Sequence, residues 1–263
     1  MFRLTREVRF AVNHPADYSL AHHPTNNYAG YPSLSGFGSF LTLQATLVGN
    51  LDPASNYLVN IKRIDSAVRE RAIPFVTAVF GLAPLTPEQT VAQLFNRLTG
   101  AWPGLELQYL RLALSPFLSY SASVSELPMV RLSQKFEFSA THRLHNPALS
   151  ETENCRIYGK CNNPHGHGHN YEVQVTLSGT PNDDGILISV PAFETIVASA
   201  VIDRFDHKNL NVELPEFREL IPTVENIARV IYGLLKPRFD ESASRLAGVT
   251  VWETPKTFCE YSE

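Results

Sequence analysis

Residues 166–179 read GHGHNYEVQVTLSG, a histidine-glycine ladder that runs directly into an alternating strand pattern. The same register occurs earlier, where residues 36–49 read GFGSFLTLQATLVG and six of the fourteen positions are identical. Three further matches keep the same order along the chain: FAVNH (10–14) with FSATH (138–142), YLVNIKRIDSAV (57–68) with ILISVPAFETIV (186–197), and TPEQTVAQLFNRL (86–98) with PTVENIARVIYGLL (222–235). Four ordered matches favour a tandem duplication.

Each half is expected to run strand, strand, helix, helix, strand, strand, which is an α+β fold. In the second half we expect these elements: strands over 135–142 and 168–178, a helix after 189–191, a helix from Thr223, and strands over 249–254 and 257–260. Each unit would then be an antiparallel four-stranded sheet with two helices on one face. Such units usually hide their remaining face and edges by assembling into a barrel. The expected domains are 1–122 and 130–263, joined by a polar linker over roughly 119–133.

Three histidines of the second half are placed to meet. His167 and His169 stand two apart in a strand and therefore share one of its faces. His142 ends another alternating run, so an adjacent strand would bring a third imidazole alongside them. Three neutral imidazoles with no obvious fourth ligand are typical of a catalytic zinc site with one open position. The alternative is a flexible surface tract that binds metal by chance.

Composition excludes several classes of function. The chain has 263 residues and a net charge of -4, with no block of Lys or Arg, so nothing indicates a nucleic-acid or anionic-membrane partner. No apolar run approaches the ~20 residues of a membrane span, and the N-terminus lacks the features of a signal peptide. Three cysteines form no disulfide framework. We expect a cytoplasmic protein.

The second half resembles the 6-pyruvoyl tetrahydropterin synthase family, which has the tunnelling fold. Five blocks carry the resemblance in family order: FSATHRLH, ENCRIYGKCNNPHGHGHNYEVQVTLSG, FDHKNLN, TVENIA and WETP. The resemblance implies a zinc-dependent lyase that converts 7,8-dihydroneopterin triphosphate to 6-pyruvoyl-tetrahydropterin with loss of triphosphate. Related members make 6-carboxy-tetrahydropterin in queuosine biosynthesis, and that reaction is the near alternative.

The family motifs imply a role for each matching position of this chain. The implied zinc ligands are His142, His167 and His169. The implied catalytic residues are Cys161, Asp206 and His207, and the implied pterin contacts are Glu253 and Thr223. A cysteine near a metal gains thiolate character and can act as a base, and a carboxylate matches the paired N–H donors of a pterin ring.

The residues alone leave other readings open. Cys161 could be a passive thiol or a fourth metal ligand, Asp206 and His207 could be a surface pair, and Glu253 could be an ordinary exposed carboxylate. His165 creates a second HGH and is interpreted as a bystander or a substrate contact. Charge and proximity to the motifs suggest four triphosphate contacts: Arg143, Arg156, Lys160 and Lys208.

The first half lacks the functional residues of the second. Phe37 and Ser39 stand where the second half has His167 and His169, and only His14 survives of the three histidines. His22 and His23 fall in a Pro- and Asn-rich stretch. We therefore expect a catalytically silent first copy in a homo-oligomer, either a trimer of tandem chains or a hexamer. A pterin- or purine-binding scaffold without catalysis is the alternative from another functional class.

Overall fold

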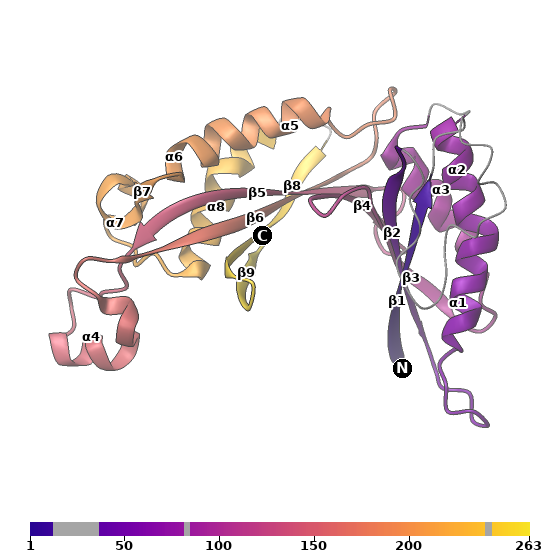
Figure 1. Ribbon diagram of the computed structural model, residues 1–263, viewed down its shortest axis with the longest axis horizontal. Coiled ribbons are helices and arrows are strands. Elements are labelled where there is room, and N and C mark those ends of the chain that lie inside the picture. The colour runs from indigo at the N-terminus through magenta and orange to yellow at the C-terminus, as the bar shows by residue number, and fades with distance from the viewer. Residues whose placement is uncertain (13–36, 82–84, 240–243) are drawn as a thin grey trace. The chain divides into compact units, whose positions relative to one another are not determined.

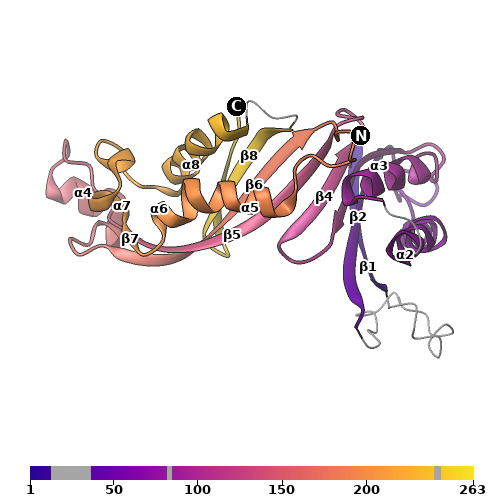
Figure 2. The same cartoon turned by 90° about the horizontal axis from the view of Figure 1, so that it is seen from above.

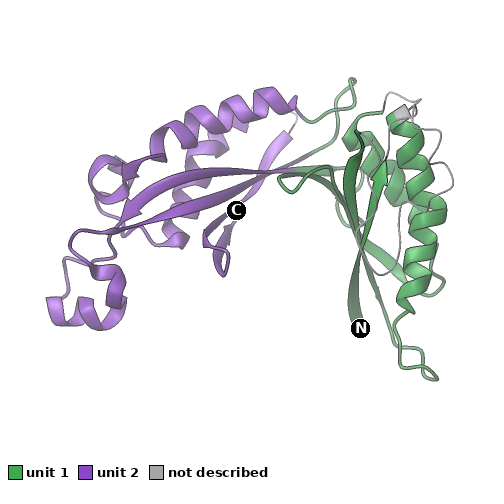
Figure 3. Cartoon of the chain, in the orientation of Figure 1, with its two compact units in different colours: residues 1–132, 179–187 green, residues 133–178, 188–263 purple. Residues whose placement is uncertain are grey.

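The computed structural model describes residues 1–12, 37–81, 85–239 and 244–263. The chain forms two compact units, which Figure 3 distinguishes by colour. Unit 1 consists of Met1–Leu132 and Gly179–Leu187, and unit 2 consists of Ser133–Ser178 and Ile188–Glu263. The chain therefore passes from unit 1 to unit 2, returns to unit 1 for nine residues, and ends in unit 2.

Unit 1 contains an antiparallel sheet in the order β1-β2-β3-β4. Its strands are β1 (Phe2–Val12), β2 (Ser39–Gly49), β3 (Glu106–Ala113) and β4 (Leu118–Ser123). Alternate side chains point into the core, so that Phe10, Leu43 and Leu110 are completely buried. The strand β4 occupies the start of the segment expected to be a linker, so that expectation was wrong: its Ser119 and Ser121 are polar but buried, and they pair with β3.

One long helical segment and one shorter helix cover one face of this sheet (Figure 1). The long segment consists of α1 (Ile61–Ala67), a π-helical stretch η2 (Val68–Ala72) and α2 (Ile73–Gly81). The shorter helix, α3 (Pro87–Leu98), begins with a capping box in which Thr86 and Gln89 satisfy each other's backbone N–H groups.

The nine residues of unit 1 that follow unit 2's long hairpin pack against the start of α3. The hydroxyl of Thr86 donates to the carbonyl oxygen of Gly185, and the backbone N–H of Leu187 donates to Glu88 Oε1 at 3.2 Å. Glu88 is 1% exposed. Burial raises the pKa of Glu88 above its ordinary value, because water no longer stabilises the charged carboxylate.

Unit 2 contains strands in the order β5-β6-β8-β9, with a short β7 beside β5. These strands are β5 (Val130–His142, whose first three residues belong to unit 1), β6 (His167–Gly179), β7 (Lys208–Asn209), β8 (Ser244–Thr254) and β9 (Thr257–Tyr261). Ser133 lies opposite Thr176 and Ser139 opposite Asn170, so β5 and β6 run in opposite directions. The expected strands of the second half are therefore present, with β5 and β8 each starting five residues earlier than expected.

Helices cover one face of the unit 2 sheet, as Figures 1 and 2 show for α5 and α8. The helical elements are α4 (Glu151–Tyr158), η3 (Gly159–Asn162), α5 (Val190–Val197), η4 (Ala198–Ile202), α6 (Asp203–Phe205), α7 (Leu210–Glu213), η5 (Pro215–Phe217) and α8 (Val224–Phe239). Aromatic rings join the layers: Phe136 of β5 meets Phe193 of α5 with ring centroids 5.8 Å apart, and Phe138 of β5 meets Phe205 of α6 at 5.4 Å. The sequence had not indicated α4.

Two local features recur in both units. A π-helical stretch interrupts the first long helix of each, at Val68–Ala72 and at Ala198–Ile202. In each unit a first-strand side chain also bonds an acid on that helix: Arg6 binds Asp65, and Gln134 binds Glu194. When the two halves are aligned in the repeat register, the two π-helical stretches lie within one residue of each other, and so do the two acids. Such stretches are rare in proteins.

None of the described helices combines the length and the apolar character needed to cross a membrane. His14, His22 and His23 lie outside the described residues.

Candidate functional site

Three histidines converge where β5 ends and β6 begins. His142 Nε2 lies 3.1 Å from His167 Nε2, and the three ring centroids of His142, His167 and His169 lie 4.5 to 5.2 Å apart. Alternation along the strands explains the convergence, because His167, His169 and Tyr171 share one face of β6. The tight turn before β6 requires Gly166, whose φ is +72° and where a Cβ would lie 3.0 Å from the carbonyl oxygen of His142.

A fourth side chain, Glu253 from β8, reaches the same cluster. Its Oε1 lies 3.3 Å from His142 Nε2 and 3.5 Å from His169 Nε2. The four candidate ligand atoms lie within 4.8 Å of one another, and no other such metal-binding group occurs in the part of the chain that the structure describes. In unit 1, the position matching His167 is Phe37, whose side chain is almost fully exposed.

The surroundings of the histidines suit a metal. His142 is completely buried, and its Nδ1 lies 2.7 Å from the carbonyl oxygen of Pro222, which fixes the ring with Nε2 toward the cluster. His167 Nδ1 and His169 Nε2 are buried and have no hydrogen-bond partner. Burial lowers the pKa of both His167 and His169, so the neutral form that binds metals is favoured.

The pKa of Glu253 lies below its usual value, first through its contact with His142 and then through the nearby imidazoles, against the opposing effect of burial. Glu253 is therefore an ionised carboxylate beside three imidazoles. A divalent cation satisfies this combination of donors, and the residues present fit a metal site.

Cys161 lies on the short η3 segment that follows α4, and its thiol is free and half-buried. The backbone N–H of Leu144 donates to the carbonyl oxygen of Cys161 at 2.9 Å, which ties this segment to the chain two residues after His142. Burial raises the pKa of Tyr171 well above its usual value, and a smaller contribution comes from Cys161. Tyr171 in turn places its hydroxyl 3.4 Å from His142 Nδ1, and the backbone bond to Leu144 holds the Cys161 segment near the same end of β5.

Asn162, which is buried, holds the Cys161 segment in place. Its Oδ1 accepts from Arg143 Nη2 at 2.9 Å and pairs with His145 Nδ1 at 2.9 Å, and its Nδ2 donates to Glu151 Oε1 at 2.8 Å. The guanidinium of Arg143 also donates to the carbonyl oxygen of Asn162. This arrangement was not foreseen from the sequence. It engages Arg143 within the protein, whereas the sequence had suggested a triphosphate contact.

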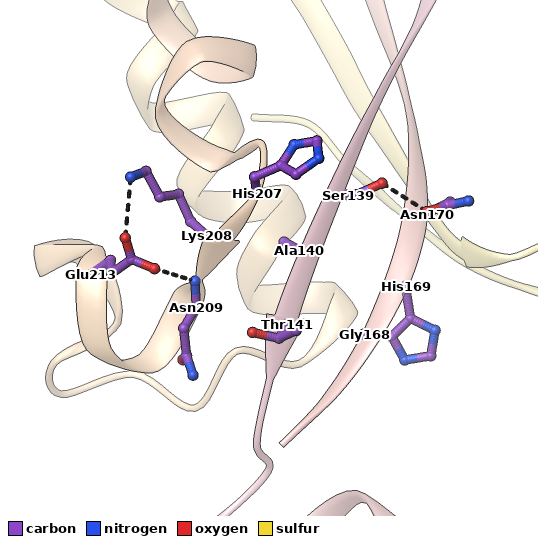
Figure 4. A pocket seen from close by; sticks show the side chains of 10 residues that line it. All are labelled: Ser139, Ala140, Thr141, Gly168, His169, Asn170, His207, Lys208, Asn209 and Glu213. Carbon is purple, nitrogen blue, oxygen red and sulfur yellow. Dashed lines mark hydrogen bonds and ion pairs between the residues drawn. The ribbon is translucent and has the colours of Figure 1, made fainter. Parts of the chain in front are cut away.

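Asp206 and His207 form a pair at the other side of the hairpin. His207 Nδ1 lies 2.8 Å from Asp206 Oδ2, while Asp206 Oδ1 accepts from the backbone N–H of Ser139 at 2.8 Å. These bonds lower the pKa of Asp206, the Ser139 bond first. The side chain of His207 is 83% exposed, and Figure 4 shows it beside β5, with both strands between it and His169.

A pocket of about 590 Å³ opens at this place. His207, Ser139, Asn170 and Glu213 line it, and Lys208 pairs with Glu213 there at 3.1 Å (Figure 4). The structure thus brings the three histidines, Glu253 and the Cys161 segment together, and it leaves Asp206 and His207 facing outward.

The remaining expected residues have simpler surroundings. Thr223 precedes α8, and its hydroxyl accepts from the backbone N–H of Asn226 at 3.4 Å, a role that its position before an apolar helix had indicated. His165 is exposed and stands outside the histidine cluster. The Pro222 carbonyl that orients His142 was missed, since a backbone group leaves no signal in a sequence.

Known proteins resemble the second half of the chain. The family model described as 6-pyruvoyl tetrahydropterin synthase matches residues 131–263. The 6-pyruvoyl tetrahydrobiopterin synthase of Drosophila melanogaster is 37% identical over 140 residues, which cover 52% of this chain and 82% of that protein. The human protein of the same name is 36% identical over 132 residues, which cover 50% of this chain and 90% of that one.

Two further relatives widen the comparison. A 6-carboxy-5,6,7,8-tetrahydropterin synthase of Haemophilus influenzae is 30% identical over 156 residues, covering 51% of this chain and all of that protein. The solved structure of Caenorhabditis elegans 6-pyruvoyl tetrahydropterin synthase is 36% identical, with a TM-score of 0.49, and covers 52% of this chain and 98% of that one. With its histidine cluster and the match over half its length, this chain belongs to the 6-pyruvoyl tetrahydropterin synthase family and is a lyase-type enzyme of the pterin synthase class.

Proposed function

We propose that this protein is a zinc-dependent lyase that converts 7,8-dihydroneopterin triphosphate to 6-pyruvoyl-tetrahydropterin with loss of triphosphate. The observation that carries the proposal is the convergence of His142, His167 and His169 beside the tethered Cys161 segment. When bound there, zinc would polarise the vicinal hydroxyls of the substrate side chain and raise the acidity of the adjacent C–H groups.

The chain's own residues would transfer the protons and bind the pterin ring. Cys161 would take a proton from the carbon skeleton as the general base. Asp206 would keep His207 in one tautomer through the 2.8 Å contact at Nδ1, leaving Nε2 free to move protons at the neighbouring carbon. Glu253 would bind the paired N–H donors of the pterin ring, with Thr223 as a second contact.

The outward position of Asp206 and His207 supports assembly into a homo-oligomer. The side chain of His207 is 83% exposed and lines the open pocket together with His169, and we expect a second copy of the catalytic unit to close this pocket. The open edge strands β1 and β9 offer places for such pairing into a barrel, either as a trimer of tandem chains or as a hexamer.

We further propose that residues 1–122 are a degenerate tandem copy without a metal site and that 130–263 are the catalytic copy. The recurring π-helical stretches, and the matching pairs Arg6–Asp65 and Gln134–Glu194, support the duplication independently of the sequence match. Phe37 and Ser39 in place of two histidines support the loss of the metal site. Metal analysis is expected to give about one zinc per chain, and a value near two would refute a silent first copy.

The function is tested by incubating the purified full chain with 7,8-dihydroneopterin triphosphate and measuring released triphosphate. We expect release by the wild type, loss of release in Cys161→Ala with zinc retained, and unchanged release in the matched control Cys259→Ala. Equal turnover in Cys161→Ala would reject the base assignment. Zinc binding and pterin binding without any triphosphate release by the wild type would support the scaffold alternative.

The nearest alternative reaction yields 6-carboxy-tetrahydropterin, as the name of the Haemophilus influenzae relative implies for that protein. Mass spectrometry of the product distinguishes the two reactions, because a pyruvoyl and a carboxyl substituent differ in mass. We expect the pyruvoyl product, since the relatives named for it are 36 to 38% identical, against 30% for the carboxy relative.

A further inference from the structure

Unit 1 contains a buried contact between a helix start and a loop, and the chain carries a second copy of both. The backbone N–H of Leu187 donates to Glu88 Oε1 at 3.2 Å, and the hydroxyl of Thr86 donates to the carbonyl oxygen of Gly185. Glu88 is 1% and Leu187 5% exposed, so this contact is closed to water. The second copies of its two halves lie at the start of α8 and in the loop after β2.

The start of α8 repeats the start of α3. In the repeat register Thr223 takes the place of Thr86, and Glu225 takes the place of Glu88. Each threonine hydroxyl accepts a backbone N–H from the first turn of its helix, at 3.2 Å in α3 and at 3.4 Å in α8. Glu225, unlike Glu88, is exposed. This helix start therefore has the same form, but no loop covers its carboxylate.

The loop after β2 repeats the loop that covers Glu88. A backbone hydrogen bond closes each loop, from Asp52 to Tyr57 at 2.8 Å and from Asn182 to Ile186 at 3.0 Å. In each loop the residue before the closing carbonyl has a left-handed backbone, with φ of 57° in the first and 80° in the second. Such values are uncommon outside glycine, so the shared turn is a specific likeness.

The loop after β2 is uncovered where its counterpart is packed. Leu58 takes the place of Leu187 in the repeat register, and its backbone N–H has no hydrogen-bond partner among the residues that the structure describes. Tyr57 is 60% and Ile61 47% exposed, and together with Phe2 they line a largely apolar groove of about 390 Å³. The loop thus offers an N–H donor beside apolar surface, and α8 offers an exposed carboxylate.

We propose that the loop after β2 docks onto the start of α8 in a second copy of the chain, where the backbone N–H of Leu58 donates to Glu225. The two surfaces meet between chains because they belong to opposite ends of the strand order: the loop follows the neighbour of edge strand β1, and α8 leads to the neighbour of edge strand β9. A contact between unlike surfaces joins copies head to tail. This inference makes the assembly proposed above specific and does not depend on the reaction.

The contact would also decide which edges pair. An exposed edge strand can pair with any other edge, including the same edge of another copy. The Glu225 carboxylate gains its N–H donor only where the loop after β2 comes beside it, so β9 would pair with β1 and not with a second β9.

The first test measures self-association of the full chain by analytical ultracentrifugation and hydrogen exchange at the Leu58 N–H. Glu225→Ala should weaken self-association at least about 10-fold, because it removes a hydrogen bond to a charged group. It should also make the Leu58 N–H exchange as fast as in dilute, dissociated protein. The matched control is Glu219→Ala, which alters an exposed acid outside α8 and should match the wild type in both measurements.

Two results of this test would overturn the proposal. One is a wild-type chain that stays monomeric. The other is a wild-type value of either self-association or Leu58 exchange in Glu225→Ala, since Glu225 would then not be the partner of this N–H.

A charge exchange tests the head-to-tail direction. Tyr57→Glu would place a carboxylate beside Glu225 of the next copy, and Glu225→Arg would remove the acceptor, so each variant alone should associate weakly. Mixed in equal amounts, the two variants should recover association, because the new carboxylate of one chain meets the new guanidinium of the other, and the remaining contact is native. Both residues are exposed, and circular dichroism checks that both variants fold. No recovery in the mixture would refute head-to-tail docking.

Failure of the proposed function is distinguishable, because triphosphate release by the wild type is measured separately. Normal release together with wild-type association of Glu225→Ala refutes this inference alone. Recovered association in the mixture without any triphosphate release by the wild type refutes the reaction alone.

Discussion

Replacing Asn162 by alanine should release the segment that carries Cys161. The substitution removes the contacts of the amide with Arg143, His145 and Glu151, at 2.9, 2.9 and 2.8 Å. A buried hydrogen bond to a charged group contributes about 1.5–3 kcal/mol. Arg143 is 27% and Glu151 63% exposed, so water weakens these bonds. We therefore expect their loss to cost a total of about 2 kcal/mol.

A loss of about 2 kcal/mol makes local opening about 30-fold more frequent. The backbone N–H of Leu144 is the reporter, because it donates to the carbonyl oxygen of Cys161 and becomes free when the segment opens. Hydrogen exchange at this N–H should be about 30-fold faster in Asn162→Ala, with exchange in β3 of unit 1 unchanged. Triphosphate release should fall through kcat, with little change in KM, because the substrate contacts remain.

The exposed neighbour gives the matched control. Asn163→Ala alters an exposed side chain that accepts from the backbone N–H of His165 at 3.1 Å, and this variant should exchange at the wild-type rate. A wild-type rate of hydrogen exchange in Asn162→Ala would refute the role of Asn162 in holding the Cys161 segment. An increase in KM alone would instead show that the Arg143 region contacts the triphosphate.

Three further predictions concern stability and metal content. Asp65→Ala leaves Arg6 without its 2.8 Å partner and should destabilise unit 1 by about 3 kcal/mol, whereas Glu194→Ala, at the exposed equivalent, should cost less than about 1 kcal/mol; urea unfolding followed by circular dichroism measures both. Because burial raises the pKa of Glu88, its contribution to stability is complete below the ordinary value of 4.5 and is lost as pH rises through the raised pKa. Glu88→Gln should therefore unfold at higher urea than the wild type at pH 7, with the difference shrinking toward pH 4.5; a constant difference would contradict this. Chelator-treated protein should lose triphosphate release and regain it with zinc, and full activity without metal would reject a metal-dependent reaction.

Periodicity in the sequence was sufficient to predict much of unit 2. Alternation placed His167 and His169 on one face of β6, and the Ser189 and Thr223 signals marked the starts of α5 and α8. The start of the segment 119–133 was misread, because Ser119 and Ser121 are buried in β4 and not exposed in a linker.

The supporting contacts of the site could not be read from the sequence. Asn162 gathers partners from 11 and 19 residues away, and its own type is as common in loops as in buried networks. Glu253 was assigned to the pterin, yet it reaches the histidines only because β8 lies beside β6. Such long-range contacts depend on strand order, which no local pattern encodes.

The return of the chain to unit 1 over Gly179–Leu187 limits how this protein can be divided. A truncated chain that starts at residue 130 would keep those nine residues between β6 and α5. It would lack Thr86 and Glu88, to which they are hydrogen-bonded. The proposed catalytic half would then contain an unsupported segment at the end of β6, the strand whose start holds His167 and His169. The amino-terminal copy that we propose to be silent would in this way be indispensable as a structural anchor.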